Sequence, residues 1–426
     1  MNWQKIRTHI FMVTGSQVLQ KLVGFLVIAL MTRHLTRTEM GAFFLAVGIG
    51  TIAAQATELG TTRHIIRSVA RDHPGSLGHL SRALSLRLPF MAAVFLLVNL
   101  ACLVVRPELS HTLLLVTLYL MLQDIQFSFA AFFNGLELYG YRVMIDLVGQ
   151  MLLAVLAVVI VWDGGGLHAV LWAYVAANAS VVAVTLWIIL SRHGRPHLEW
   201  DLGAVRGVAR QSLPIFAVTL LDTIHFKADT IMLGFLKPLT AVASYDAAYR
   251  LFEVSRLAIR PVALIFFPIC VGMAARHEWP QLKALFGKLT RISLLLGTLA
   301  ALVVVAAAGF LVPKAFGIKY LDSVPLVRVL YLTAPVLFTG LLAVALIHTL
   351  HLERYAIRAA VGCIIANVSL NAIAIPRWGP IGCAWITVIT QSLWTGWLVV
   401  ILYRHLEETE AEPVEMVPPE SSSFAV

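Results

Sequence analysis

The chain is a succession of long apolar stretches separated by short segments that are basic or rich in Gly and Pro. A helix needs about 20 apolar residues to cross the hydrocarbon core of a bilayer, and runs of that length recur throughout. Runs such as Met151–Trp162 do not alternate between polar and apolar residues, which excludes the strands of a membrane β-barrel. We therefore predict an all-α polytopic membrane protein. Its twelve expected spans cover residues 10–32, 41–62, 88–105, 110–134, 143–162, 167–190, 212–236, 241–272, 292–312, 329–348, 359–375 and 380–403.

The second half of the chain weakly repeats the first. A shift of 214 residues aligns three positions of one half with three of the other, namely Leu136, Leu138 and Tyr141 with Leu350, Leu352 and Tyr355. Six spans repeated once predict two six-helix bundles around a central cleft, residues 1–200 and 201–403, the architecture by which transporters alternate access. The tail 404–426 is rich in Glu and Pro, which predicts disorder.

The composition supports a membrane protein. Hydrophobic residues make up 59% of the chain and charged residues 13%, against roughly 45–50% and about 25% in soluble proteins. The net charge of +9 does not indicate nucleic-acid binding, because the basic residues lie between apolar runs. The inner connection between the second and third spans is the most basic, with Arg63, Arg67, Arg71, Arg82 and Arg87.

Lysine and arginine counts in short connections predict the orientation of the chain. With the N-terminus inside, 19 basic residues lie in inner segments and eight in outer ones. We therefore predict that both termini are cytoplasmic. The outer eight are Arg33, Arg37, Arg106, Lys237, Lys314, Lys319, Arg328 and Arg377.

Several short motifs resemble a known family, the polysaccharide transporters. The opening segment runs from Arg33 to Gly41 and is followed by Glu58-Leu-Gly60 and Arg63. Further similar segments are Ser212–Phe216, Asp229–Gly234, Tyr245–Arg250, Pro268, Asn367, Asn371, Ile375-Pro376 and Gly379–Ala384. The likeness covers about residues 5–403, but Val242-Ala243 stands where relatives carry Val-Gly, and the acidic tail is not part of the pattern.

The resemblance implies a flippase of the multidrug/oligosaccharidyl-lipid/polysaccharide exporter superfamily. Such a protein moves undecaprenyl-diphosphate-linked oligosaccharide from the cytoplasmic to the periplasmic leaflet of a bacterial inner membrane, for lipopolysaccharide O-antigen or exopolysaccharide synthesis. Expected partners are the lipid-linked substrate, membrane lipids, a polysaccharide polymerase and glycosyltransferases. Multidrug antiporters and flippases for the peptidoglycan precursor are similar in fold.

Charged residues concentrate in the seventh and eighth predicted spans. A charge at mid-helix costs roughly 2.5–3.5 kcal/mol on insertion scales, so it normally faces a cavity or a partner. Four acids balance four bases here, so pairing within the protein is one interpretation. The eight residues are Asp222, Lys227, Asp229, Asp246, Arg250, Glu253, Arg256 and Arg260.

The second interpretation is a binding site for a diphosphate. Arg256 and Arg260 lie past the last acid of their span, and Lys21 has no carboxylate on the first span. Guanidinium groups match phosphate oxygens bidentately. We therefore predict substrate contacts from Lys21, Lys227, Arg250, Arg256, Arg260, Gln17 and Asp124, and ion coupling or charge pairing at Asp222, Asp229, Asp246 and Glu253.

Other functions are less well supported. A multidrug or small-solute antiporter of the same fold would suit acids such as Asp124 and Asp222. A polysaccharide polymerase would be expected to present a large outer loop, and none is predicted. The pairs His193/His197 and His348/His351 have no third ligand nearby in sequence, and there is no Walker motif. We expect no metal, no cofactor, no nucleic acid and no enzymatic activity.

Overall fold

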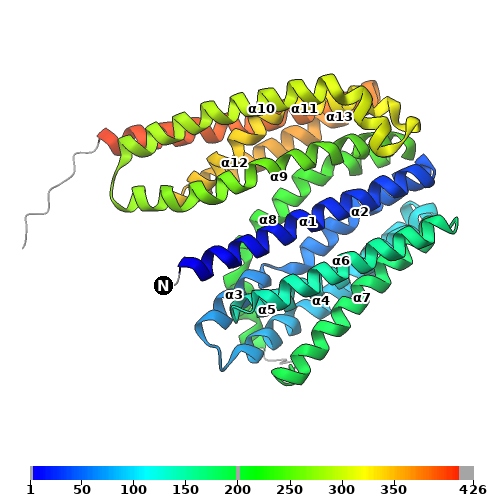
Figure 1. Ribbon diagram of the computed structural model, residues 1–426, viewed down its shortest axis with the longest axis horizontal. Coiled ribbons are helices and arrows are strands. Elements are labelled where there is room, and N and C mark those ends of the chain that lie inside the picture. The colour runs from blue at the N-terminus through cyan, green and yellow to red at the C-terminus, as the bar shows by residue number, and fades with distance from the viewer. Residues whose placement is uncertain (1–2, 198–201, 412–426) are drawn as a thin grey trace, which may run out of the picture.

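The structure is a computed structural model that describes residues 3–197 and 202–411, and it is helical almost throughout that part (Figure 1). Within these ranges it describes no side chains for residues 3–11, 13–14, 202–215, 218, 255–261, 263–265 and 410–411. The N-terminal half contains α1 (Trp3–His34), α2 (Arg37–Glu58), α3 (Thr61–Arg71), α4 (Ser76–Val105), η1 (Pro107–Leu109), α5 (Ser110–Gly135), α6 (Tyr139–Trp162) and α7 (Leu167–Arg192). The C-terminal half contains α8 (Leu202–Leu236), α9 (Leu239–Ala275), α10 (Trp279–Phe316), η2 (Ile318–Ser323), α11 (Val324–Tyr331), α12 (Ala334–Thr349) and α13 (Glu353–Ala411).

All twelve predicted spans fall in helices, but three of the predicted boundaries differ. The second span, predicted over 41–62, ends at Glu58 because Leu59 and Gly60 adopt left-handed conformations, with φ of 48° and 71°. The tenth is divided into α11 and α12, which meet at a bend of 49°. The last two are continuous in α13, with a kink at Gly379 where φ is 62°. This helix continues to Ala411, so it enters the predicted tail, whose residues 412–426 lie outside the described part.

The length and composition of the helices fit a multi-pass membrane protein. Over the described residues, eight helices are long and apolar enough to cross a membrane, or nine if the bent pair α11 and α12 forms one span. Large apolar side chains are exposed along the outward faces of α4 and α10, including Leu97, Val104, Leu302 and Val303. An apolar surface of this extent is stable only against another apolar medium, and lipid is the medium that these helices fit.

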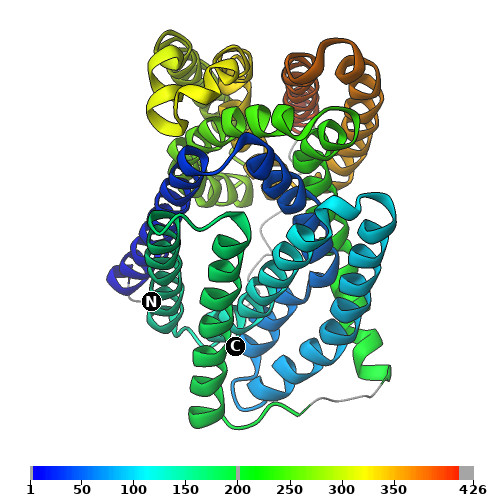
Figure 2. The same ribbon diagram turned by 90° about the vertical axis from the view of Figure 1, so that its right-hand side faces the viewer.

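The helices form two groups. Figure 1 shows α1–α7 in one group and α9–α13 in the other, with α8 running between them, and Figure 2 shows the same division from the end of the molecule. Helix α2 packs against both α8 and α9, while α8 also packs against α13. We call the contact region of α2, α8 and α9 the seam. The all-α fold with two bundles is as predicted.

Two glycines allow the helices to approach closely at the seam. A Cβ at Gly41 of α2 would lie 1.9 Å from the carbonyl oxygen of Leu239 in α9, and one at Gly234 of α8 would lie 2.5 Å from Leu45. Small residues are the usual means by which membrane helices pack backbone to backbone. The same apolar cluster contains Phe43 of α2 and Tyr245 of α9. The core therefore continues across the seam.

Candidate functional site

The end of the seam that we predict to face outside is closed by basic side chains. Arg37 of α2 reaches across to Ser244 of α9 and Asp322 of η2, and it also donates to the carbonyl oxygen of Thr240 at 3.3 Å. Ser244 donates in turn to Asp322 at 2.9 Å. The Arg37 guanidinium lies 5.8 Å from the centre of the Tyr320 ring.

Three further outer basic residues join the two halves through main-chain oxygens. Arg33 donates to the carbonyls of Lys314 and Ala315, and Lys319 returns the contact by donating to the carbonyls of Arg33 and Leu35. Arg106 donates to the carbonyl of Gly234 at 3.0 Å. We call Arg33, Arg37, Arg106 and Lys319, with their acceptors, the outer latch.

Away from the latch, two cavities border the seam, and both are lined by Thr219 of α8. The first, of about 330 Å³, lies mainly in the N-terminal half and has many amide, hydroxyl and charged groups on its wall. It is lined by Thr51, Ala54, Gln55, Glu58, Thr62, Leu120, Gln123, Asp124, Phe127, Ala130, Ala131, Asn134, Arg142 and Thr219.

The second cavity, of about 310 Å³, lies mainly in the C-terminal half and is more apolar. Apart from Arg63 of α3, its wall comes from α8, α12 and α13. Its polar positions include Asp222, His225, His348 and Glu353, and its apolar positions include Phe226, Val344, Ile347, Ile357, Ile364 and Trp394.

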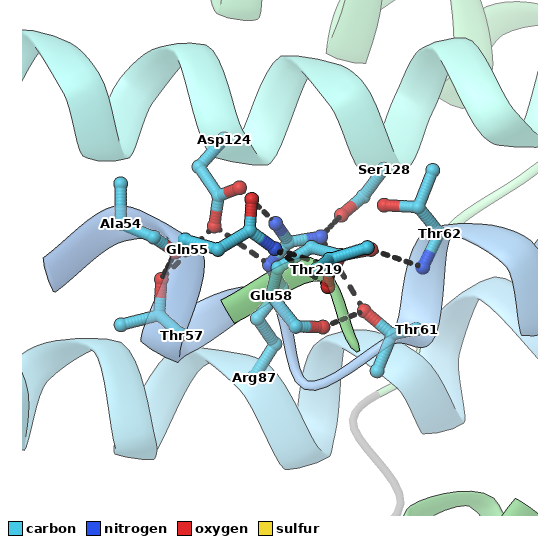
Figure 3. A network of polar contacts seen from close by, with 10 residues as sticks. All are labelled: Ala54, Gln55, Thr57, Glu58, Thr61, Thr62, Arg87, Asp124, Ser128 and Thr219. Atoms are coloured by element: carbon cyan, nitrogen blue, oxygen red, sulfur yellow. Dashed lines mark hydrogen bonds and ion pairs between the residues drawn. The ribbon is translucent and has the colours of Figure 1, made fainter. Parts of the chain in front are cut away.

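A buried ion pair lies beside the first cavity (Figure 3). The side chain of Arg87 in α4 is fully buried, and its Nε donates to the Asp124 carboxylate of α5 at 2.9 Å. Thr57 of α2 also donates to Asp124, at 3.0 Å, and Arg87 makes a further bond to Ser128. Asp124 is 6% exposed.

The neighbouring end of α2 is held by its own polar side chains (Figure 3). Gln55 donates to Glu58 at 3.1 Å and to Thr219 of α8 at 3.3 Å, so this contact crosses the seam. The other Glu58 oxygen accepts the backbone N–H of Thr62 at 3.2 Å. Glu58 therefore stabilises the start of α3 while it faces the cavity.

These contacts concern two residues singled out from the sequence. Arg87 lies one residue before the expected third span, in a predicted inner connection, and the structure places it inside α4, where its charge is neutralised by Asp124. Asp124, which we predict to contact substrate, lines the cavity, and its carboxylate accepts hydrogen bonds from Arg87 and Thr57.

The predicted contacts on α1 lie elsewhere. Gln17 and Lys21 are exposed on that helix, and Lys21 already interacts within the chain. Gln20 and Gln126 hydrogen-bond to the carboxylate of Asp146 in α6. Asp146 in turn pairs with Arg142 at 3.6 Å. Gln17 and Lys21 do not line either of the two cavities.

A second buried carboxylate lies in the C-terminal half. Asp229 of α8 is 5% exposed, and its hydrogen-bond partners among the described residues are neutral. Tyr245 and Thr387 donate their hydroxyls to one oxygen at 2.9 and 2.7 Å, and Asn371 donates to the other at 2.8 Å. The Oδ1 atom of Asn371 is buried and has no hydrogen-bond partner. Carboxylate, amide and hydroxyl oxygens are the ligands that hard cations prefer.

Several other charges of the seventh and eighth spans interact with groups of the same chain. Arg250 pairs with Glu253 at 3.3 Å and lies over the ring of Phe44 at 5.6 Å, so it spans the seam. Asp246 accepts from Thr230 at 3.0 Å, and it interacts electrostatically with Lys227 and Arg250. The predictions for Arg256 and Arg260 fall on side chains outside the described residues.

The histidine pairs engage other groups. His348 lies 3.4 Å from a carboxylate oxygen of Glu353, and the ring of His193 meets that of Phe132 edge to face at 5.2 Å. Among the residues that the structure describes, no group of three His, Cys, Asp or Glu side chains is placed to hold a metal ion.

Comparison with known proteins identifies the family. A family model described as polysaccharide biosynthesis protein matches residues 6–273, which is more than half of the chain. The chain belongs to this family. A search of curated proteins finds no significant match.

The fold matches solved transporters of the MOP superfamily. An inward-facing multidrug resistance MATE family transporter is 12% identical, with a TM-score of 0.71 and coverage of 92% of this chain and 95% of that one. The lipid II flippase MurJ in an inward closed conformation is 11% identical, with a TM-score of 0.70 and coverage of 92% and 88%. A MOP superfamily transporter from Pyrococcus furiosus is 14% identical, with a TM-score of 0.66 and coverage of 96% of each chain. These solved neighbours are transporters or flippases, and the likeness shows that this chain shares their fold.

Proposed function

We propose that this protein is a flippase that carries undecaprenyl-diphosphate-linked oligosaccharide from the cytoplasmic to the periplasmic leaflet of a bacterial inner membrane. The observation that carries the proposal is a seam with two cavities whose outer end is latched shut. Such a state is ready to accept a ligand from the inner side. Family membership points to polysaccharide synthesis, and the fold to export.

The first cavity suits the glycan. Its wall includes amide and hydroxyl groups that can exchange hydrogen bonds with sugar hydroxyls, and they come from three different helices, as Gln55, Gln123, Asn134, Thr51 and Thr62 show. The second cavity supplies apolar wall for the lipid side of the substrate. Because Thr219 lines both, one ligand can occupy the two together.

Ion coupling is assigned to Asp229 in this proposal. The described groups around its buried carboxylate are neutral, so the site has room for one positive charge, either a proton or a monovalent cation. Asp246 and Glu253 are already engaged with Thr230 and Arg250 and serve as structural partners. Asp222 lines the second cavity, where it meets the substrate.

A reversible lock on the outer latch tests export. Cysteines at Arg37 and Asp322, joined by a short bifunctional thiol reagent applied from outside, hold the two halves together at that end. We expect glycan export to stop and lipid-linked glycan to accumulate in the inner leaflet. Export should return when a cleavable reagent is reduced.

A cysteine pair within one half is the matched control. His111 of α5 and His168 of α7 lie in the same half at the end that we predict to face outside, with ring centroids 4.4 Å apart, so joining cysteines at these two positions does not restrain the seam. Export that continues at full occupancy of the Arg37/Asp322 link would contradict the proposal.

The acids of the first cavity favour one alternative, a multidrug antiporter. Glu58 faces the cavity, and Asp124 lines it. A cationic drug would bind favourably to a cavity lined by carboxylates. Drug resistance conferred by the wild-type chain and lost in Glu58→Gln, without any change in surface glycan, would support the antiporter over the flippase.

A further inference from the structure

Helix α3 is firmly anchored on one face. Its residues Ile65 and Val69 are fully buried, and they pack in a cluster with Leu80, Phe129 and Phe132 from α4 and α5. The left-handed Leu59 and Gly60 end α2 and connect it directly to α3. The helix therefore presents its opposite face in a fixed orientation.

That opposite face carries a row of three arginines. Arg63, Arg67 and Arg71 recur at intervals of four residues, and all three are exposed. Four residues along an α-helix correspond to about 6 Å, so the guanidinium groups emerge in one row about 12 Å long. Within the described part of the chain, no ion pair involves any of the three. We call this set the α3 ladder.

The ladder leads into the second cavity. Arg63 is the one residue of α3 on the wall of that cavity, whose other walls are largely apolar. Arg71 lies at the opposite end of the helix, next to the connection to α4 at the end of the molecule that we predict to be cytoplasmic. The row thus runs from the predicted inner headgroup level to the second cavity, whose wall combines apolar side chains with the polar positions Asp222, His225, His348 and Glu353.

We propose that the α3 ladder is the loading site at which the diphosphate of a polyprenyl-linked substrate is taken from the inner leaflet and passed to Arg63. The inference rests on the proposed flippase function and names residues for its first step. Guanidinium groups bind phosphate oxygens in bidentate pairs, and successive positions allow the diphosphate to move without losing all its contacts. The apolar wall beside Arg63 then receives the adjoining part of the lipid.

The position of Arg63 favours one class of ligand. Bulk anionic phospholipids would pair with any exposed inner arginine, whereas a ligand held by Arg63 can also use the cavity wall to which Arg63 contributes. A polyprenyl diphosphate combines the required charge with an apolar chain. Its affinity should therefore depend on Arg63 more than on inner arginines elsewhere.

The test uses the purified full chain in nanodiscs of neutral phosphatidylcholine, with undecaprenyl diphosphate as the probe. Arg63→Gln should weaken binding about tenfold, and the triple variant with Arg67→Gln and Arg71→Gln by about a hundredfold or more. Arg63→Lys keeps the charge but loses the fork, so it should retain part of the affinity. The control, Arg358→Gln with Arg404→Gln, removes two exposed inner arginines away from the ladder and should bind as wild type.

Two competitors and the thermal unfolding midpoint complete the experiment. A tenfold excess of phosphatidylglycerol should leave probe binding unchanged, and inorganic diphosphate should compete only weakly because it lacks the lipid. Wild-type binding by the triple variant, or equal displacement by phosphatidylglycerol, would overturn the ladder and leave the flippase proposal standing. Absence of binding by the wild-type chain would overturn both. An unchanged midpoint shows that a variant with weaker binding is folded. If the midpoint of a variant shifts, the binding of Arg67→Gln is compared with that of the wild type instead, because Arg67 lies on the exposed face.

Discussion

The two halves of the protein bury a carboxylate to nearly the same extent and treat it in opposite ways. Asp124 in the N-terminal half is 6% exposed and is neutralised by the fully buried Arg87. Asp229 in the C-terminal half is 5% exposed and receives hydrogen bonds only from hydroxyl and amide groups in the contacts described. An ion pair fixes the charge state of its acid, whereas neutral donors leave room for a cation or proton to come and go. We therefore propose a structural role for Asp124 and a functional role for Asp229.

The largest effect is expected from Arg87→Ala. It leaves Asp124 buried without its cation, which costs about 3–5 kcal/mol. The midpoint temperature of thermal unfolding of the purified protein should fall, and so should the amount of the protein in the membrane. Adding Asp124→Asn should recover much of the loss, because the stranded charge is then removed; a single variant as stable as wild type would show that the pair is not isolated from water.

Asp229→Asn should affect transport and leave stability nearly unchanged. Asparagine has the same shape, and the hydroxyls of Tyr245 and Thr387 can accept as well as donate hydrogen bonds. We expect glycan export to fall by about tenfold or more and to lose its dependence on the coupling ion, a difference of roughly 1.4 kcal/mol or more in the driving step. Asp246→Asn is the control, because Asp246 is buried to a similar extent. An equal loss of glycan export in Asp246→Asn would mean that Asp229 has no special role in coupling.

Tyr245→Phe removes one of the donors to Asp229 and keeps the ring packing. A hydrogen bond to a charged group contributes about 1.5–3 kcal/mol, and Thr387 and Asn371 remain. Stability should fall by an amount in that range, measured by chemical unfolding in detergent. If Asp229 is protonated in the purified protein, the loss will be near the value for a neutral bond, about 1 kcal/mol.

The smallest effect is expected at Arg250. Its pair with Glu253 is partly exposed, with side chains 21% and 33% accessible, and such pairs contribute about 0–1 kcal/mol. Arg250→Ala should therefore destabilise much less than Arg87→Ala, and Glu253→Gln should add little to it. Asp246 also interacts with Arg250 but keeps its interaction with Lys227, so a loss as large as that of Arg87→Ala would mean that Lys227 alone does not balance Asp246.

The helices and their order could be predicted because apolar runs of membrane length dominate the sequence. The pairing of Arg87 with Asp124 could not, because 37 residues and a connection separate them and the spacing rules for one helix do not apply. Asp222 and Asp229 lie in one helix, as predicted, and their spacing of seven residues puts them on one face, but α8 passes from the second cavity into the C-terminal core along its length. Residues that share a face therefore end in different surroundings.

The sequence singled out three residues only as parts of motifs, namely Tyr245, Asn367 and Asn371. Nothing in the sequence shows which carboxylate a neutral hydrogen-bond donor will contact, so their position near Asp229 could not be predicted.

The outer latch has a consequence for how this closure can change through mutation. Arg33, Arg106 and Lys319 donate to main-chain carbonyl oxygens, which every residue possesses. Replacing the residue that carries such an oxygen leaves the acceptor in place, so these contacts can be lost from the donor side alone. Among the described latch contacts that join the two halves, only those of Arg37 end on side chains, Ser244 and Asp322, that can be exchanged in compensation. Arg106 also pairs with Glu108, but within its own half. The latch contacts between the halves therefore depend on a few basic residues, and among these only Arg37 can show correlated substitutions with side chains of the other half.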